Sequence, residues 1–433
     1  METFLYFFVF TKPWLGALSL SEFPFQDFKD VAQESVPSTG LTGYVDAAFV
    51  VFSGLYLYNH RQSLRLLPYR RLWVTFLALL LVSSLFITPF PVLGLRRLVK
   101  VVVFFSMYAV AFILAREKPS GTVAYLKWLV RSAWVPVLYG VGNFVAHAKL
   151  TWAGIANREY REYSTFLHAN PFAYFCIIVL VIVFTLWRYH PRCQYQHGRL
   201  HLAFLAVLTV AAVIMAGARA AILASFAAYL LLSRSSWKLR VASACLGVIA
   251  LLQAPTFVNP VSALGQVTLN NGRGVAETLV EAGRGLDTEQ FEHTGELAGR
   301  FLIWSTMILS LEGHYAIGRG LAYSSLFYEN ETGEFYYSHN DYLTLMFETG
   351  IFGLLLYWSI LVGVAWLLLR QRKGLAPGSL PGLLADAGLF LIAFLALVSC
   401  ADNLFVDSYN TPIIWSILGA ATGSIPPKRA EAT

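Results

Sequence analysis

The sequence is poor in charge. Only 13% of its 433 residues are charged, whereas soluble domains carry about 25%. Hydrophobic residues make up 57% of the chain, and the mean hydropathy is +0.58. A soluble fold could not bury so many long apolar runs, so this composition predicts an all-α polytopic membrane protein.

Cysteines and the motifs of soluble enzymes are scarce as well. The chain has no P-loop and no Gly-x-Gly-x-x-Gly motif, which excludes a transporter that hydrolyses ATP within this chain. It has no basic soluble domain, so we expect no nucleic-acid partner. The cysteines show neither a disulfide framework nor a metal-ligand spacing, and we interpret them as small buried hydrophobic residues. They are Cys176, Cys193, Cys245 and Cys400.

Long apolar runs predict about twelve transmembrane helices, since one span needs about 20 apolar residues. The start of the chain has no basic segment and no small-residue cleavage site, so we expect a retained first span. The predicted organisation is nine spans in 1–253, a large external loop in 254–340, and three spans with a tail in 341–433. The spans lie near 4–20, 41–58, 72–93, 98–115, 123–147, 167–187, 200–217, 219–233, 240–255, 341–369, 383–400 and 408–425.

The distribution of basic residues predicts the topology. A basic cluster follows every even-numbered span, and the positive-inside rule assigns these clusters and both termini to the cytoplasm. Five basic residues then lie outside, which suggests anion binding there. The alternative is that outside loops tolerate some positive charge. The five are Arg96, Arg97, Lys100, Arg158 and Arg161.

The external loop is expected to contain an amphipathic helix. Phe301, Trp304, Ile308 and Leu311 recur at helical spacing. The helix is too short to cross a bilayer, so we expect it to lie at the membrane interface. The glycines at 313, 318 and 320 predict a mobile turn after it.

Two arginines are candidates for binding an anion. Arg219 lies between two apolar runs that contain no carboxylate, where an unpaired guanidinium costs about 3 kcal/mol. A phosphate would match its planar fork; the alternative is an arginine that reaches the head groups. Arg300 opens the external helix, where the helix dipole disfavours a cation unless an anion is bound. The alternative is an ordinary surface arginine.

His339 lies where the long polar loop meets an apolar helix. An ionisable residue at the mouth of a span is a candidate for function. A neutral imidazole can accept a proton from an alcohol, and Asn340 or Asp341 could orient it. A structural histidine is the alternative. The external acids Glu348, Asp402 and Asp407 form no closely spaced carboxylate pair, so we expect no metal.

Four segments, in order, are similar to the motifs of one family. Residues 165–173 are similar to a Gly-Thr-Phe-x-x-Pro-Asn-x-x-Ala stretch, with Asn and Pro in reverse order. Residues 216–221 resemble a Ser-Arg-Gly hairpin, with Ala for Ser and Gly. Residues 299–304 resemble Gly-Arg-x-x-x-Trp, and 338–353 resemble His-Asn-x-x-Leu followed by Glu-x-Gly-x-x-Gly. Over residues 165–365 the chain thus resembles the O-antigen ligase and polymerase superfamily of bacterial envelope enzymes.

This resemblance implies a C-type glycosyltransferase-like fold in the bacterial inner membrane, with its active site facing the periplasm. The implied reaction transfers a glycan from undecaprenyl diphosphate and needs no metal, nucleotide or other cofactor. His339 would be the general base. Arg219 and Arg300, with Arg158 and Arg161, would bind the diphosphate. Asn340, His168 and Arg319 are candidate supporting residues.

The function that we expect is an O-antigen ligase that transfers the glycan to lipid A-core, with inversion in a single displacement. Arg96, Arg97 and Lys100 would bind the phosphate-rich acceptor. The expected partners are the lipid-linked donor, this acceptor and membrane lipids. One alternative is an O-antigen or exopolysaccharide polymerase of the same superfamily. Another is a carrier or flippase, which would need the arginines but not His339.

The predicted topology can be tested by labelling single cysteines in intact cells. Cys193 follows an even-numbered span and should react only with reagents that enter the cytoplasm. Cys400 should react from outside, because it ends an odd-numbered span. Reaction of Cys193 with an impermeant external reagent would contradict this topology.

Overall fold

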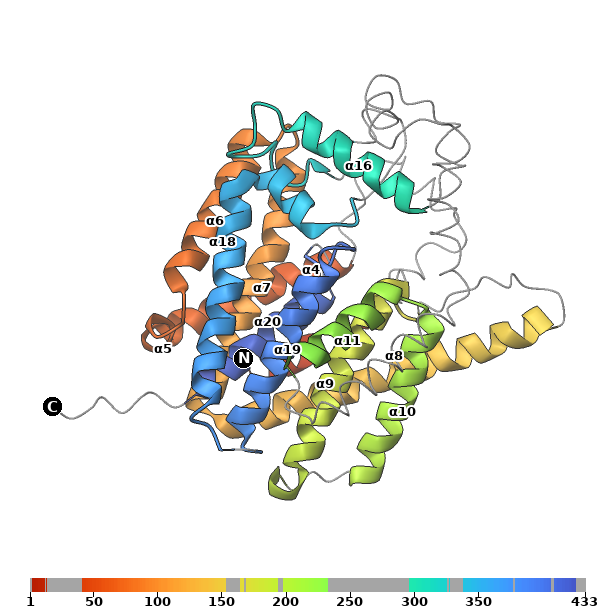
Figure 1. Cartoon of the computed structure of the whole chain (residues 1–433). Coiled ribbons are helices and arrows are strands. Elements are labelled where there is room, and N and C mark those ends of the chain that lie inside the picture. The colour runs from red at the N-terminus through yellow and green to blue at the C-terminus, as the bar shows by residue number, and fades with distance from the viewer. Residues whose placement is uncertain are drawn as a thin grey trace.

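The described part of the chain is built from helices (Figure 1). The computed structural model describes residues 2–11, 13, 41–152, 164–166, 169–193, 198–232, 296–324, 327, 338–376, 378–405 and 409–425. No strand occurs within these ranges. The predicted all-α fold is therefore confirmed.

The helices follow the predicted spans closely. A helix overlaps every predicted span except 240–255, which lies outside the described residues. In chain order the elements are α1 (Glu2–Thr11), α4 (Leu41–Asn59), α5 (Arg61–Arg65), α6 (Arg70–Val82), the π-helix η2 (Ser83–Ile87), α7 (Pro91–Glu117), α8 (Pro119–Trp152), α9 (Ala169–Cys193), α10 (Arg199–Ala216), α11 (Arg219–Leu232), α16 (Glu296–Ser310), α18 (Asp341–Arg372), α19 (Leu380–Val398) and α20 (Asn410–Gly423).

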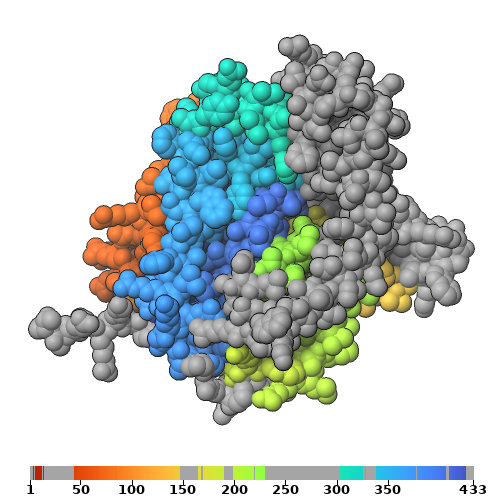
Figure 2. Space-filling model, viewed as in Figure 1, coloured from red at the N-terminus to blue at the C-terminus, as the bar shows by residue number. Residues whose placement is uncertain are grey.

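Length and composition make this a multi-pass membrane protein. Among the described residues, seven helices are long and apolar enough to cross a bilayer. Large apolar side chains are exposed on the outer faces of these helices, as on α18 at Phe352, Leu355 and Trp366, and Figure 2 shows α18 lying along the surface. Such side chains suit contact with lipid. The total of twelve spans stays a prediction.

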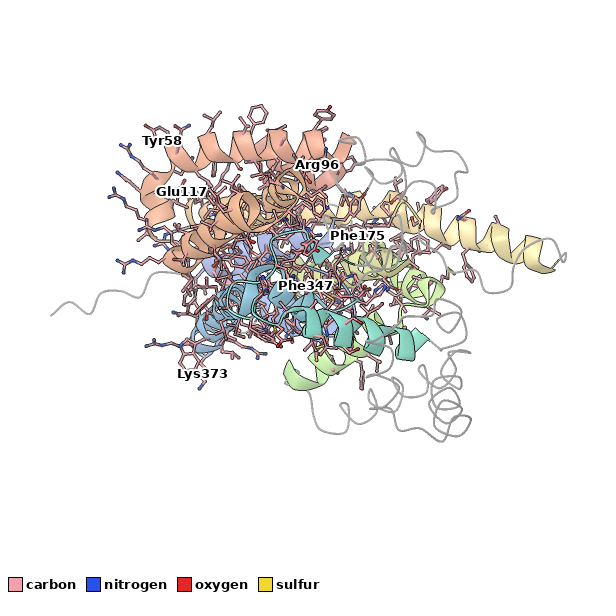
Figure 3. The ribbon with its side chains drawn as sticks, turned by 90° about the horizontal axis from the view of Figure 1, so that it is seen from above. Tyr58, Arg96, Glu117, Phe175, Phe347 and Lys373 are labelled. Carbon is pink, nitrogen blue, oxygen red and sulfur yellow. The ribbon has the colours of Figure 1, made fainter. Side chains whose placement is uncertain are left out.

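Three of the predicted cytoplasmic exits lie at one end of the helix bundle. Figure 3 shows Tyr58, Glu117 and Lys373 together there, whereas Arg96 lies away from them. His60 Nδ1 lies 2.8 Å from Glu117 Oε2, which joins the exits of α4 and α7. This common end agrees with the pattern of basic clusters. Its assignment to the cytoplasm stays a prediction.

α18 is interrupted at Gly350, and the segment after α16 packs into the interruption. Gly350 has φ 69° and ψ −173°, a conformation that is essentially restricted to glycine. The carbonyls of Phe347 and Glu348 accept hydrogen bonds from the N–H groups of Arg319 and Gly320, at 2.7 and 3.1 Å. The glycine-rich segment that we predicted to be a mobile turn is therefore docked onto α18, because the break exposes backbone groups that need partners.

The external helix forms as predicted, but it buries a different face. In α16, Ile303, Met307 and Leu311 are buried against Phe347 of α18, whereas Ile308 is 46% exposed. The prediction that Ile308 belongs to the buried face was wrong. Apolar residues occur almost all round this helix, so helical spacing alone could not select the face that packs.

The cysteines follow the prediction only in part. Cys176 is buried within α9, as expected for a small hydrophobic residue, but Cys400 is exposed. Cys400 lies two residues after the end of α19, in the turn that leads to residue 405. The prediction that it is buried was wrong because this turn lies outside the packed helices. Its exposure suits the labelling test.

Replacing Gly350 with alanine should destabilise the protein. A Cβ at this position would overlap the carbonyl of Ala316, and the backbone conformation would cost about 1–3 kcal/mol. We expect a lower midpoint of thermal unfolding in detergent. Gly54→Ala is the control, because a Cβ at Gly54 meets nothing within 4 Å. Equal midpoints for the two variants would contradict this account of the break.

Candidate functional site

His339 lies in the short stretch before α18, at the end of the bundle opposite Lys373. Its backbone has φ 47°, in the left-handed region that residues other than glycine seldom adopt. Asn340 is the N-cap of α18, and its side chain accepts a hydrogen bond from the N–H of Leu343 at 3.0 Å. Such strain at a candidate catalytic residue persists only where the surrounding contacts fix the backbone.

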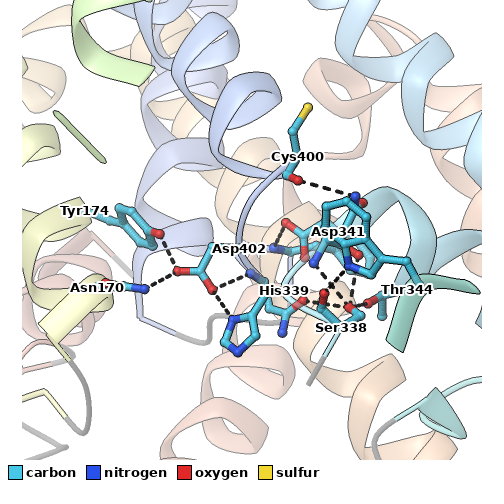
Figure 4. Close-up of polar contacts among 12 residues, drawn as sticks. Asn170, Tyr174, Ser338, His339, Asp341, Thr344, Cys400 and Asp402 are labelled. Carbon is cyan, nitrogen blue, oxygen red and sulfur yellow. Dashed lines mark hydrogen bonds and ion pairs between the residues drawn. The ribbon is translucent and has the colours of Figure 1, made fainter. Parts of the chain in front are cut away.

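Asp402 holds the imidazole of His339 (Figure 4). His339 Nδ1 lies 3.2 Å from Asp402 Oδ1, and the same oxygen accepts the N–H of Asn403 at 2.8 Å. The other oxygen, Oδ2, accepts Asn170 Nδ2 at 2.6 Å and the hydroxyl of Tyr174. A carboxylate has about four acceptor sites. All four are therefore filled.

The contacts of Asp402 keep it ionised. Burial of the group raises its pKa, but hydrogen bonds from His339, Tyr174 and the N–H of Asn403 outweigh burial and lower the pKa of Asp402 below its usual range. An ionised carboxylate with filled acceptor sites is a poor base for a substrate. It can fix the orientation of an imidazole that carries its proton on Nδ1, and Nε2 of that tautomer can then accept a proton.

A second aspartate fastens the segment that carries Asp402. Asp341 Oδ2 accepts the hydroxyl of Ser399 and the N–H of Phe405, each at 2.7 Å. The N–H of Asp341 donates to the carbonyl of Ser399 at 2.9 Å. Sequence reasoning considered Asn340 or Asp341 as the group that orients His339. In the structure these residues build the support, and Asp402 contacts the imidazole.

The external helix also contacts this site. Trp304 of α16 donates from Nε1 to the carbonyl of Ser338 at 2.6 Å, and Ser338 Oγ lies 2.5 Å from Thr344 Oγ1. Arg300 lies four residues before Trp304, which is about one helical turn along the same face. α16 is therefore tied to the residue before His339 by the face on which Arg300 begins.

The predicted hairpin at Arg219 has the expected break. Gly217 ends α10 with φ 60°, and Arg219 is the first residue of α11. α11 packs against α19 and α9, the two helices that flank Asp402 in sequence and hydrogen bonding. The first residue of α11 thus belongs to the group of helices that builds the site.

Other predicted site residues have different places. The guanidinium of Arg319 donates from Nε to the carbonyl of Ser310 at 2.7 Å and so caps the end of α16. Arg97 Nη2 lies 3.9 Å from Glu348 Oε1, and the side chain of Arg97 is 12% exposed. Arg96 and Lys100 are partly buried on α7. Three predicted residues lie outside the described ranges, namely Arg158, Arg161 and His168.

Sequence reasoning missed the roles of Asp402, Asn170 and Tyr174. Asp402 was noted only as an external acid, and it is 63 residues from His339. A local signal existed for the other two, since Asn170 and Tyr174 are four residues apart at the start of a span. That spacing places two polar groups on one helix face, which is unusual in an otherwise apolar run.

The comparison with protein families agrees with the resemblance stated from the motifs. The family model described as O-antigen ligase matches residues 204–358. This range includes Arg219, Arg300 and His339, and it stops before Asp402. None of the curated proteins matches the chain. The match supports a function of the O-antigen ligase or polymerase type, with lipid-linked glycans and membrane lipids as partners.

The lowered pKa of Asp402 predicts how its contribution to stability depends on pH. Because the pKa is lower in the folded state, the contribution is complete above the unfolded value of about 4 and is lost as the pH falls further. Wild type should therefore unfold at a higher temperature than Asp402→Asn from pH 5 to 7. The difference should narrow below about pH 4.

The control for this measurement is Asp386→Asn. Asp386 pairs with Arg372 at the other end of the bundle and is partly exposed, so its loss should cost little. A difference between wild type and Asp402→Asn that stays constant down to pH 3, or that is absent at pH 7, would contradict the ionised, hydrogen-bonded state of Asp402.

Proposed function

We propose that this protein transfers a glycan from undecaprenyl diphosphate to lipid A-core, with His339 as the general base. The observation that carries the proposal is the contact between His339 and the fully hydrogen-bonded carboxylate of Asp402. It combines with the family match over residues 204–358. We further propose that the protein lies in the bacterial inner membrane with this site facing the periplasm.

The proposed chemistry follows from the pairing of His339 with Asp402. Oδ1 of Asp402 holds the proton on Nδ1 of the imidazole, so Nε2 takes the proton of the acceptor hydroxyl. The hydroxyl oxygen then attacks the anomeric carbon, and the bond to the diphosphate breaks. Asp402 stabilises the imidazolium that forms. A single displacement of this kind inverts the configuration at the anomeric carbon.

The proposed diphosphate ligands are Arg300 and Arg219. Arg300 lies one turn from Trp304, whose indole is bonded to the carbonyl next to His339. Arg219 starts a helix that packs against α19 and α9. Guanidinium groups can bind the oxygens of a leaving diphosphate in two places at once and stabilise its developing charge. Arg158 and Arg161 remain proposed ligands on the sequence alone.

The preference for lipid A-core rests on charge. Arg96 and Lys100 are four residues apart on α7, so they share one face of that helix, and Arg96 lies away from the basic end of the bundle (Figure 3). Two cations in such a position suit an acceptor that carries phosphates. Arg97 contributes less to this argument, because its side chain is mostly buried beside Glu348.

The function can be tested with purified protein, labelled lipid-linked glycan, and lipid A-core supplied or withheld. We expect glycan on lipid A-core only when lipid A-core is present. Extension of the lipid-linked glycan without lipid A-core would show a polymerase. Movement of the donor across a bilayer without any transfer would show a carrier. Either of these results would overturn the ligase assignment.

The roles of the site residues are tested in the same assay. His339→Ala should lower kcat about 10²–10⁴-fold and leave donor binding nearly unchanged, because a base acts in the chemical step. Arg300→Lys should lower kcat about tenfold or more, since an ammonium does not replace a bidentate fork. The matched controls are His314→Ala in the external segment and Arg116→Lys at the other end of α7. Normal turnover by His339→Ala would remove the base.

A further inference from the structure

We infer that Tyr174 is a positioning residue for glycan transfer, which acts on His339 through the carboxylate of Asp402. The inference rests on the proposed function. Tyr174 and Asn170 are four residues apart on α9, so both project from one face of that helix. Both donate to the same oxygen of Asp402, Oδ2. Tyr174 is 1% exposed.

These two donors determine which oxygen meets the imidazole. With Oδ2 held by α9 and Oδ1 held by the N–H of Asn403 at 2.8 Å, one acceptor direction on Oδ1 remains for Nδ1 of His339. The carboxylate cannot rotate without losing bonds to α9. The orientation of the base is therefore set by a helix that lies far from it in sequence and makes none of the other bonds to its loop among the contacts described above.

The hydroxyl of Tyr174 is separable from the rest of the side chain. The ring packs edge-on against Phe394 of α19, with 5.9 Å between centroids, and phenylalanine would keep this contact. Only the hydroxyl reaches Asp402. Tyr174→Phe therefore removes one donor from Oδ2 and retains the packing, which makes it a clean probe of positioning.

The test is a double-mutant cycle on glycan transfer by the full-length protein. Tyr174→Phe should lower kcat about tenfold, the lower end of the value of a hydrogen bond to a charged group. The KM of the donor should stay within about twofold, because Tyr174 touches Asp402 and not the substrate. In the Asp402→Asn background the same substitution should change kcat less than about twofold, since coupled residues are not additive.

The control is Tyr125→Phe. Tyr125 is also fully buried and bonds through its hydroxyl, to Ser416 of α20, so its loss should leave kcat unchanged. Thermal unfolding in detergent checks that each variant folds. If Tyr174→Phe does not fold, Asn170→Ala removes the other donor to Oδ2, and we expect the same dependence on Asp402.

The outcomes separate this inference from the function on which it rests. If wild type transfers glycan but Tyr174→Phe has the wild-type kcat, Tyr174 has no positioning role. An equal loss of kcat with and without the Asp402 carboxylate would likewise reduce Tyr174 to a packing residue. If wild type transfers glycan to no acceptor at all, the proposed function fails first, and the positioning role fails with it.

Discussion

A carboxylate buried among apolar helices must have its acceptor sites filled, and the organisation of the site follows from that requirement. Asp402 meets it with donors from three parts of the chain: α9, its own turn, and the residue before α18. Each donor must be brought to the same place by helix packing. His339 is thus one member of a set of groups whose positions depend on one another.

The helices around this set are joined by bonds that a continuous α18 could not make. The break at Gly350 leaves the carbonyls of Phe347 and Glu348 available to the segment that follows α16. α16 in turn reaches the carbonyl of Ser338 through Trp304. The external helix is thereby attached to α18 at two points, one on each side of the catalytic candidate. A lipid-linked substrate that displaced α16 would strain both attachments.

The sequence predicted the helices and the position of His339 well, because apolar runs and their polar ends are local properties. The break between α10 and α11 was visible in the same way, as a glycine between two apolar runs. The pairing of His339 with Asp402 was not predictable, since packing alone brings these residues together. Nor could spacing select the buried face of α16, whose residues are apolar almost all round. Gly350 matched a motif, but its conformation depends on the segment that docks there.

The central claim is that Nε2 of His339 takes the proton of the acceptor while guanidinium groups hold the diphosphate. An experimental structure with an unreactive donor analogue and the acceptor tests it most directly. The account predicts the acceptor hydroxyl within hydrogen-bond reach of Nε2, about 2.6–3.2 Å, and the diphosphate beside Arg300 and Arg219. A diphosphate bound away from both arginines, or an acceptor hydroxyl beyond reach of His339 and any bridging water, would contradict it.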